Sequence, residues 1–189
     1  MDAIMLALVA VLLANADGRS GTYLSRLLSV RADRRVTVVI AFGAFIINAL
    51  VAAVAGAIAN GMIGQGVAAL LVALAMLSAA AALLWRGRSA PDAGDAAGEA
   101  PVILAGRMLA GQFGDRSHFL IGALAATSGA GQWAAAGGLV GWTLAMLPFL
   151  AFGPALAERR AAHVLRWTSA LILALWGIRT GLGAFGLIG

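Results

Sequence analysis

The sequence predicts an all-α membrane protein whose six transmembrane helices form two inverted three-helix repeats. Of its 189 residues, 62% are hydrophobic and 11% are charged, whereas about 25% of the residues of a soluble domain are charged. Six apolar runs are each near the length of about 20 residues that spans a bilayer core. In addition, a polar hexapeptide occurs twice inside these runs, once in each half of the chain.

The six apolar runs define the expected transmembrane helices. The second, third and fifth runs contain no charged residue, whereas the other three do, which marks those three for function. The runs are Ala3–Leu24, Val36–Ala59, Val67–Trp85, Val102–Ala126, Gln132–Ala155 and Val164–Gly183.

The basic residues are all arginines, and most of them lie in alternate loops. Cytoplasmic loops of membrane proteins carry an excess of basic residues, so the odd-numbered loops are expected in the cytoplasm and both termini outside it. We expect the chain in the inner membrane of a bacterium. The loop arginines are Arg26, Arg31, Arg34 and Arg35 after the first run, Arg86 and Arg88 after the third, and Arg159, Arg160 and Arg166 after the fifth.

The middle of the chain changes composition abruptly. The segment SAPDAGDAAGEAP, which ends at Pro101, is rich in small residues, has two prolines and contains Asp92, Asp95 and Glu99. Such a composition predicts a flexible cytoplasmic linker over residues 86–101. It separates a first three-helix repeat over residues 1–85 from a second over residues 102–189.

The repeated hexapeptide is NADGRS at residues 15–20 and QFGDRS at residues 112–117. Each copy has an amide residue, a glycine and aspartate pair, and then Arg-Ser. Because each half has an odd number of spans, the two copies must run in opposite directions across the membrane. Inverted repeats commonly form a substrate site near the bilayer midplane, where the two copies are expected to meet.

Charged residues within a spanning helix cost about 2.5–3.5 kcal/mol on insertion scales, so they normally face the bundle interior and mark a pathway. Each copy contributes one aspartate and one arginine. In one interpretation these side chains line a transport route. In another, Asp17 pairs with Arg116 and Asp115 with Arg19, and the two pairs hold the halves together. The two interpretations are compatible.

The duplicated pattern resembles the GDT-type family of calcium/manganese cation antiporters, small six-span proteins that carry Glu-x-Gly-Asp-Lys/Arg-Ser/Thr once in each half. The resemblance covers nearly the whole chain, and residues 112–117 keep four of the five specified positions. Asn15 and Gln112 stand where the family has glutamate, and Asp17-Gly18 reverses the Gly-Asp order. The resemblance implies export of Mn²⁺ or Ca²⁺ in exchange for protons, with no resident cofactor.

By this resemblance the transported ion binds oxygen ligands, which hard divalent cations prefer. Arg116 and Arg19 would stabilise the carboxylates when the ion leaves. The expected ligands are Asp115 and Gln112, then Asp17 and Asn15, with Ser117 and Ser20 assisting.

Helical geometry predicts a different arrangement of the polar side chains in each copy. On a continuous helix Gln112 and Asp115 share one face, whereas Asp17 lies about 200° from Asn15 unless the helix unwinds at Gly18. Two further polar residues in the spans have open interpretations. His118 is either a proton carrier or a structural histidine, and Asn48 either lines the cavity or forms an interhelical hydrogen bond.

The sequence also excludes several classes of function. The chain has no cysteine, and no motif indicates an enzyme or a nucleic-acid binder. The expected partners are the lipid bilayer, the transported cation and protons. The patterns Gly137-x-x-x-Gly141 and Gly177-x-x-x-Gly181 fit packing within one subunit or a homodimer, so the oligomeric state is open. The alternatives to cation export are export of an anionic or zwitterionic solute, and a homologue that does not transport.

Overall fold

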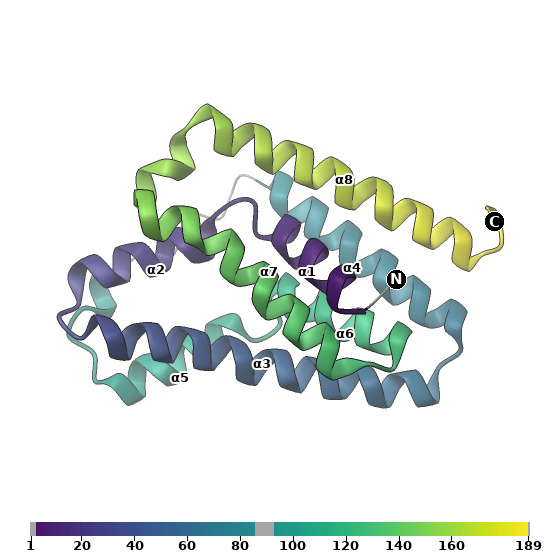
Figure 1. The fold of residues 1–189 in the computed structure, drawn as a ribbon, viewed down its shortest axis with the longest axis horizontal. Coiled ribbons are helices and arrows are strands. Elements are labelled where there is room, and N and C mark those ends of the chain that lie inside the picture. The colour runs from purple at the N-terminus through teal and green to yellow at the C-terminus, as the bar shows by residue number, and fades with distance from the viewer. Residues whose placement is uncertain (1–2, 86–92, 189) are drawn as a thin grey trace.

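The computed structural model describes residues 3–85 and 93–188, and the described residues contain helices and no strands (Figure 1). The first half consists of α1 (Ala3–Ala14), α2 (Arg19–Val30), α3 (Arg34–Met62) and α4 (Gln65–Leu84). A short 3₁₀ turn, η1 (Gly94–Ala96), precedes the second half. That half consists of α5 (Pro101–Gln112), α6 (Arg116–Ser128), α7 (Gly131–Phe152), the 3₁₀ helix η2 (Pro154–Glu158) and α8 (Arg160–Ala184).

Four of these helices, α3, α4, α7 and α8, are long and apolar enough to cross a membrane. The pair α1 and α2 meets the same criterion when taken as one bent span. These helices agree with the predicted second, third, fifth and sixth runs to within a few residues at their ends. The structure therefore supports a multi-pass membrane protein with an all-helical fold.

The first predicted span is wrong as a continuous helix. The chain leaves the helix after Ala14, resumes it at Arg19, and turns by 70° between α1 and α2. Gly18, immediately before α2, has a φ of 68°. This left-handed conformation is open to glycine at little cost and stops the propagation of a right-handed helix.

The fourth predicted span, Val102–Ala126, is divided in the same way. Helix α5 ends at Gln112 and α6 begins at Arg116, and between them Gly114 has a φ of 71°. Both breaks therefore fall inside the repeated hexapeptides. A hydropathy pattern reports which residues are apolar but does not report backbone angles, so it predicts one span where the chain forms two half-helices.

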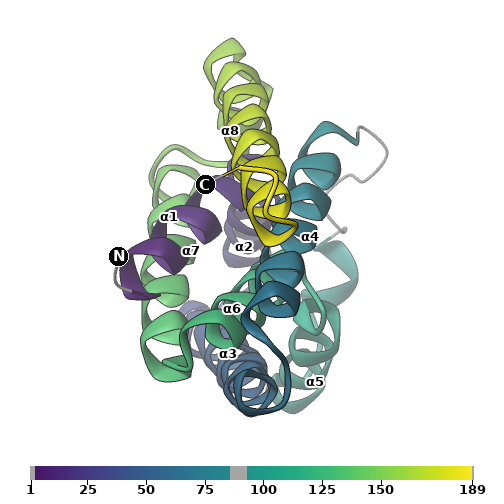
Figure 2. The same ribbon diagram turned by 90° about the vertical axis from the view of Figure 1, so that its right-hand side faces the viewer.

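The two halves have the same order of elements, a broken pair followed by two long helices, and they interleave. The broken pair α1 and α2 packs on α7, while the broken pair α5 and α6 packs on α3, and α4 packs along α8. Along the colours of Figure 1, α3 runs from left to right and α7 from right to left, and α4 and α8 are likewise opposed. Helix α6 lies in the middle of the bundle, against α1, α3, α4 and α7 (Figure 2).

Glycines allow the closest of these contacts. A Cβ atom on Gly137 would lie 2.0 Å from the carbonyl oxygen of Ile4, and one on Gly141 would lie 2.3 Å from that of Leu8. Gly177 of α8 meets α4 in a similar way, with the nearest atom of Leu77 at 3.0 Å. The interpretation of these small-residue patterns as packing within one subunit is therefore confirmed.

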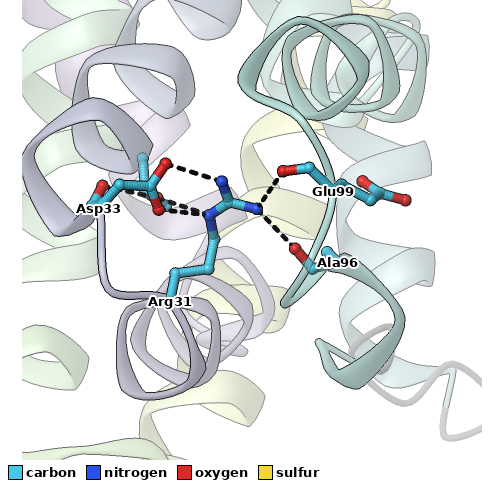
Figure 3. A network of polar contacts seen from close by, with 5 residues as sticks. Arg31, Asp33, Ala96 and Glu99 are labelled. Carbon is cyan, nitrogen blue, oxygen red and sulfur yellow. Dashed lines mark hydrogen bonds and ion pairs between the residues drawn. The ribbon is translucent and has the colours of Figure 1, made fainter.

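A buried arginine connects the start of the second half to the loop between α2 and α3 (Figure 3). Arg31, which is 6% exposed, donates through Nη1 to the carbonyl oxygens of Ala96 at 2.6 Å and Glu99 at 3.0 Å. Its Nε and Nη2 donate to the two carboxylate oxygens of Asp33 at 2.8 and 2.7 Å. The part of the predicted linker at residues 93–100 is therefore anchored, not a free tether, while residues 86–92 lie outside the described residues.

The Arg31–Asp33 pair predicts a pH dependence of stability. The hydrogen bonds from the Arg31 guanidinium lower the pKa of Asp33, so the pair stabilises the fold above the unfolded-state pKa of about 3.9. This contribution is lost as the pH falls through the lower pKa of the folded state. We expect Asp33→Asn to lower the thermal midpoint at pH 6 and to have a diminishing effect below about pH 4. A constant difference between variant and wild type down to about pH 2 would contradict this account.

Candidate functional site

The two hexapeptides meet in the interior, at the two helix breaks. Asn15 donates a hydrogen bond from Nδ2 to Oγ of Ser117 at 2.9 Å, across 102 positions of sequence. Ser117 in turn donates to Oδ2 of Asp115 at 3.2 Å. Arg116 donates from Nη2 to Oδ2 of Asp17. Two of these hydrogen bonds therefore join a side chain of one copy to a side chain of the other.

The first break orients its residues through local bonds. Asn15 also donates to the carbonyl oxygen of Val11 at 2.8 Å, which holds the side chain against the end of α1. Oδ1 of Asp17 accepts from the backbone N–H of Arg19 at 3.3 Å, at the start of α2. A carboxylate is favourable there because the first N–H groups of a helix lack partners within the helix and carry partial positive charge.

The ion pair between Asp17 and Arg116 is almost enclosed by protein. Their side chains are 10% and 11% exposed, respectively. This contact confirms one of the two ion pairs expected between the copies. The other, between Asp115 and Arg19, stays a prediction.

A cavity of about 620 Å³ opens beside this contact, between the start of α2, the break between α5 and α6, and α7. Its apolar wall includes Leu24, Met108, Trp142 and Met146. Its polar wall consists of Arg19, Ser20, Tyr23, Arg107, Gln112, Asp115 and Arg116. A partly open cavity of this size, with an apolar wall and several convergent polar groups, is typical of a small-molecule site.

Three guanidinium groups border the cavity, those of Arg19, Arg107 and Arg116, and among the described residues Asp115 supplies the one bordering carboxylate. Arg107 pairs with Glu99 at 3.0 Å, and Glu99 does not line the cavity. Asp17, the partner of Arg116, does not line the cavity either. The surface that faces the open space therefore carries more basic than acidic side chains.

The structure divides the six predicted metal ligands between two places. Gln112, Asp115 and Ser20 line the cavity. Asn15 and Ser117 are buried in the contact between the copies, and Asp17 is held there by Arg116. Within residues 3–85 and 93–188, three or more histidine, aspartate or glutamate side chains do not gather closely enough to hold a metal ion. Whether the six residues bind a cation stays a prediction.

The structure shows the unwound alternative at the first copy, because α1 ends at Ala14 and Gly18 is left-handed, and it breaks the second helix inside its motif. Asp17 lies on a non-helical turn, so the separation of about 200° from Asn15 on a continuous helix does not apply. Gln112 is the last residue of α5 and Asp115 precedes α6. They nevertheless share the cavity, because the turn at Gly114 brings both side chains to its wall.

The two remaining candidates lie outside the cavity wall. His118 is 5% exposed, its ring lies 4.7 Å from that of Phe45, and its Nε2 is 3.4 Å from the Phe45 carbonyl oxygen. Asn48 donates from Nδ2 to the carbonyl oxygen of Leu109 at 3.0 Å. The interpretation of Asn48 as an interhelical hydrogen bond, between α3 and α5, is therefore confirmed, and the cavity-lining interpretation is not.

Sequence reasoning missed several residues of the cavity, among them Arg107, Tyr23 and Trp142. Arg107 is a charged residue inside an apolar run, the same signal that identified Arg116. Tyr23 is the one tyrosine of the chain and lies one turn after Arg19, so helical spacing could have placed it on the same face. Trp142 gives no sequence signal, because a tryptophan in an apolar helix fits core packing equally well.

Comparison of the chain with protein-family models, with curated proteins and with solved structures finds no match. The resemblance to the GDT-type antiporters therefore rests on the two hexapeptides.

Proposed function

We propose that this protein is a secondary transporter that moves a small charged solute through the cavity between its two broken helices. One observation carries the proposal: both helix breaks, in an otherwise apolar chain, meet beside one polar cavity. Non-helical backbone at membrane depth is tolerated where it is buried in protein or lines a cavity. Discontinuous helices of this kind form the substrate sites of many transporters.

The arrangement of the two halves supports alternating access. The two halves have the same order of elements, and the broken pair of each half packs on a long helix of the other half. The corresponding long helices α3 and α7 run in opposite directions (Figure 1). This is the pattern expected of two inverted repeats, although the pair α5 and α6, unlike α1 and α2, does not meet the criterion for a bent span. In such proteins one repeat rocks against the other around a fixed site. We place the protein in the bacterial inner membrane, with its termini outside the cytoplasm.

The size and charge of the cavity favour an organic solute as cargo. Its volume of about 620 Å³ is about twenty times the ~30 Å³ that one water molecule occupies in the liquid, far more than a metal ion requires. The three bordering arginines also repel a bare cation. Export of Mn²⁺ or Ca²⁺ in exchange for protons is the second candidate, because Asp115, Gln112 and Ser20 bring oxygen ligands to the same space.

A single-cysteine experiment tests transport without knowledge of the cargo. The chain has no cysteine, so Ser20→Cys introduces one thiol of nearly unchanged size into the cavity wall. We expect a membrane-impermeant thiol reagent to label it from either side, in right-side-out and in inside-out vesicles. This result follows because an alternating-access protein opens its site to each side in turn.

Ser78→Cys is the matched control, since Ser78 lies on the outer surface of α4 and does not line the cavity. We expect no labelling of this thiol from either side, because lipid covers it. If the cysteine at position 20 is labelled from one side only, or from neither, the transporter proposal is wrong and the protein has a static role.

A further inference from the structure

We infer that the cavity binds a zwitterionic, amino-acid-like solute with an apolar side chain, with its acid group at Arg19 and its amino group at Gln112 and Asp115. The inference rests on the proposed function, because it names the substrate class of the same site. It starts from the observation that a guanidinium at the start of α2 and hydrogen-bond acceptors at the break between α5 and α6 lie in one cavity wall.

The cationic part of the wall is the start of α2. Arg19 and Ser20 are the first two residues of that helix and both line the cavity. The first N–H groups of a helix and a guanidinium both favour an anionic oxygen. Arg116 adds a second guanidinium at the start of α6. Among the described residues its Nε has no hydrogen-bond partner, although Asp17 accepts from its Nη2.

The accepting part of the wall is the end of α5. Oε1 of Gln112 is buried and has no hydrogen-bond partner within the described part of the chain. The carboxylate of Asp115 lines the cavity close by in sequence, and its Oδ2 accepts from Ser117. The last carbonyl groups of a helix carry partial negative charge. A protonated amine, with three donors and no acceptor, can donate to Oε1 of Gln112 and to the carboxylate of Asp115.

Neither a simple anion nor a simple cation satisfies both parts of the wall. An anion at Arg19 leaves Oε1 of Gln112 without a donor and adds charge of the same sign as Asp115. A cation at Asp115 faces the guanidinium groups that border the same space. A zwitterion meets each part with the opposite charge, and its side chain can then contact the apolar wall formed by Met108, Trp142 and Met146.

Binding to the purified full-length protein tests the substrate class, with ligands that differ only in charge. The probes are leucine, 4-methylpentanoate, which lacks the amine, and 3-methylbutylamine, which lacks the carboxylate. Titration calorimetry at pH 7 should give a Kd for leucine at least about tenfold below that of either analogue, since each analogue forfeits one set of charge-assisted hydrogen bonds. Methionine, phenylalanine and Mn²⁺ alone complete the series.

Two variants assign the ends of the ligand. Gln112→Leu should weaken leucine binding by about tenfold and leave 4-methylpentanoate binding unchanged, because only leucine carries the amine. Arg19→Gln should weaken both. Gln65→Leu, the same substitution at an exposed position at the start of α4, should change neither. An unchanged elution volume in size-exclusion chromatography shows that each variant folds.

Each alternative result overturns the inference. Equal affinity for leucine and 4-methylpentanoate indicates a plain anion site, and binding of Mn²⁺ in the absence of amino-acid binding indicates a cation site. Failure of leucine, methionine and phenylalanine all to bind also excludes the proposed class. These results are separable from the labelling experiment, since a protein labelled at position 20 from both sides transports some solute even if none of these amino acids binds.

Discussion

Replacing Asp17 with asparagine is expected to destabilise the protein by about 3–5 kcal/mol, the cost of removing one partner from a buried ion pair. The side chains of Asp17 and Arg116 are 10% and 11% exposed, so water and salt screen the remaining charge only weakly. Asparagine keeps the size of aspartate and can still accept from the backbone N–H of Arg19. The variant therefore isolates the loss of charge opposite Arg116.

Unfolding of the purified protein by denaturant, followed by the fluorescence of its tryptophans, measures this effect. Glu158→Gln is the control, because Glu158 is exposed at the end of η2, and it should change the free energy of unfolding by less than about 0.5 kcal/mol. The exchanged pair Asp17→Arg with Arg116→Asp should recover part of the loss. If Asp17→Asn is as stable as the wild type, the ion pair does not hold the two copies together.

The large features of the fold could be predicted from the sequence because they depend on composition. Long apolar runs require burial in lipid or protein, and the structure gives α3, α4, α7 and α8 close to the predicted bounds. The contact between the two hexapeptides also follows from the sequence, since polar groups in apolar helices normally face the bundle interior and pair with one another. The confirmed pair Asp17–Arg116 is the clearest example.

Neither the helix breaks nor the division of the predicted ligands between the cavity and the buried contact could be predicted in this way. Whether Gly18 adopts a left-handed conformation depends on the neighbours that the bend brings together, and those neighbours are remote in sequence. For the same reason the hydrogen bond from Nδ2 of Asn15 to Ser117 could not be predicted from the hexapeptide alone. The partner of a buried amide is decided by packing, which a hydropathy pattern does not contain.

Gly18→Ala is expected to destabilise the protein strongly, because it adds overpacking to backbone strain. A Cβ atom at this position would lie 1.9 Å from Cζ of Phe149 in α7, so the phenylalanine ring must move. The φ of 68° adds strain for any residue with a side chain. Overpacking costs about 1–3 kcal/mol and a left-handed non-glycine residue about 1–3 kcal/mol. The sum is a substantial part of the total stability of a typical protein.

Gly114→Ala is the matched comparison at the second break. Gly114 has a φ of 71°, but a Cβ atom there would meet nothing within 4 Å. It should therefore show the strain cost alone, about 1–3 kcal/mol, in the same unfolding measurement. Adding Phe149→Leu should recover part of the loss in Gly18→Ala but none of it in Gly114→Ala. Equal losses for the two alanine variants would contradict the contact with Phe149.

The difference between the two breaks bears on transport. The first break is fixed against α7 by Phe149, whereas the open space around Gly114 lets the second break change its angle without displacing a neighbour. If one half-helix of the second break moves while the other stays in place, the moving one should be α5, because α6 packs against α1, α3, α4 and α7. Gly18→Ala should therefore act chiefly on stability. Gly114→Ala should stiffen the moving break, and lower the rate at which the thiol of Ser20→Cys is labelled from one side of the membrane.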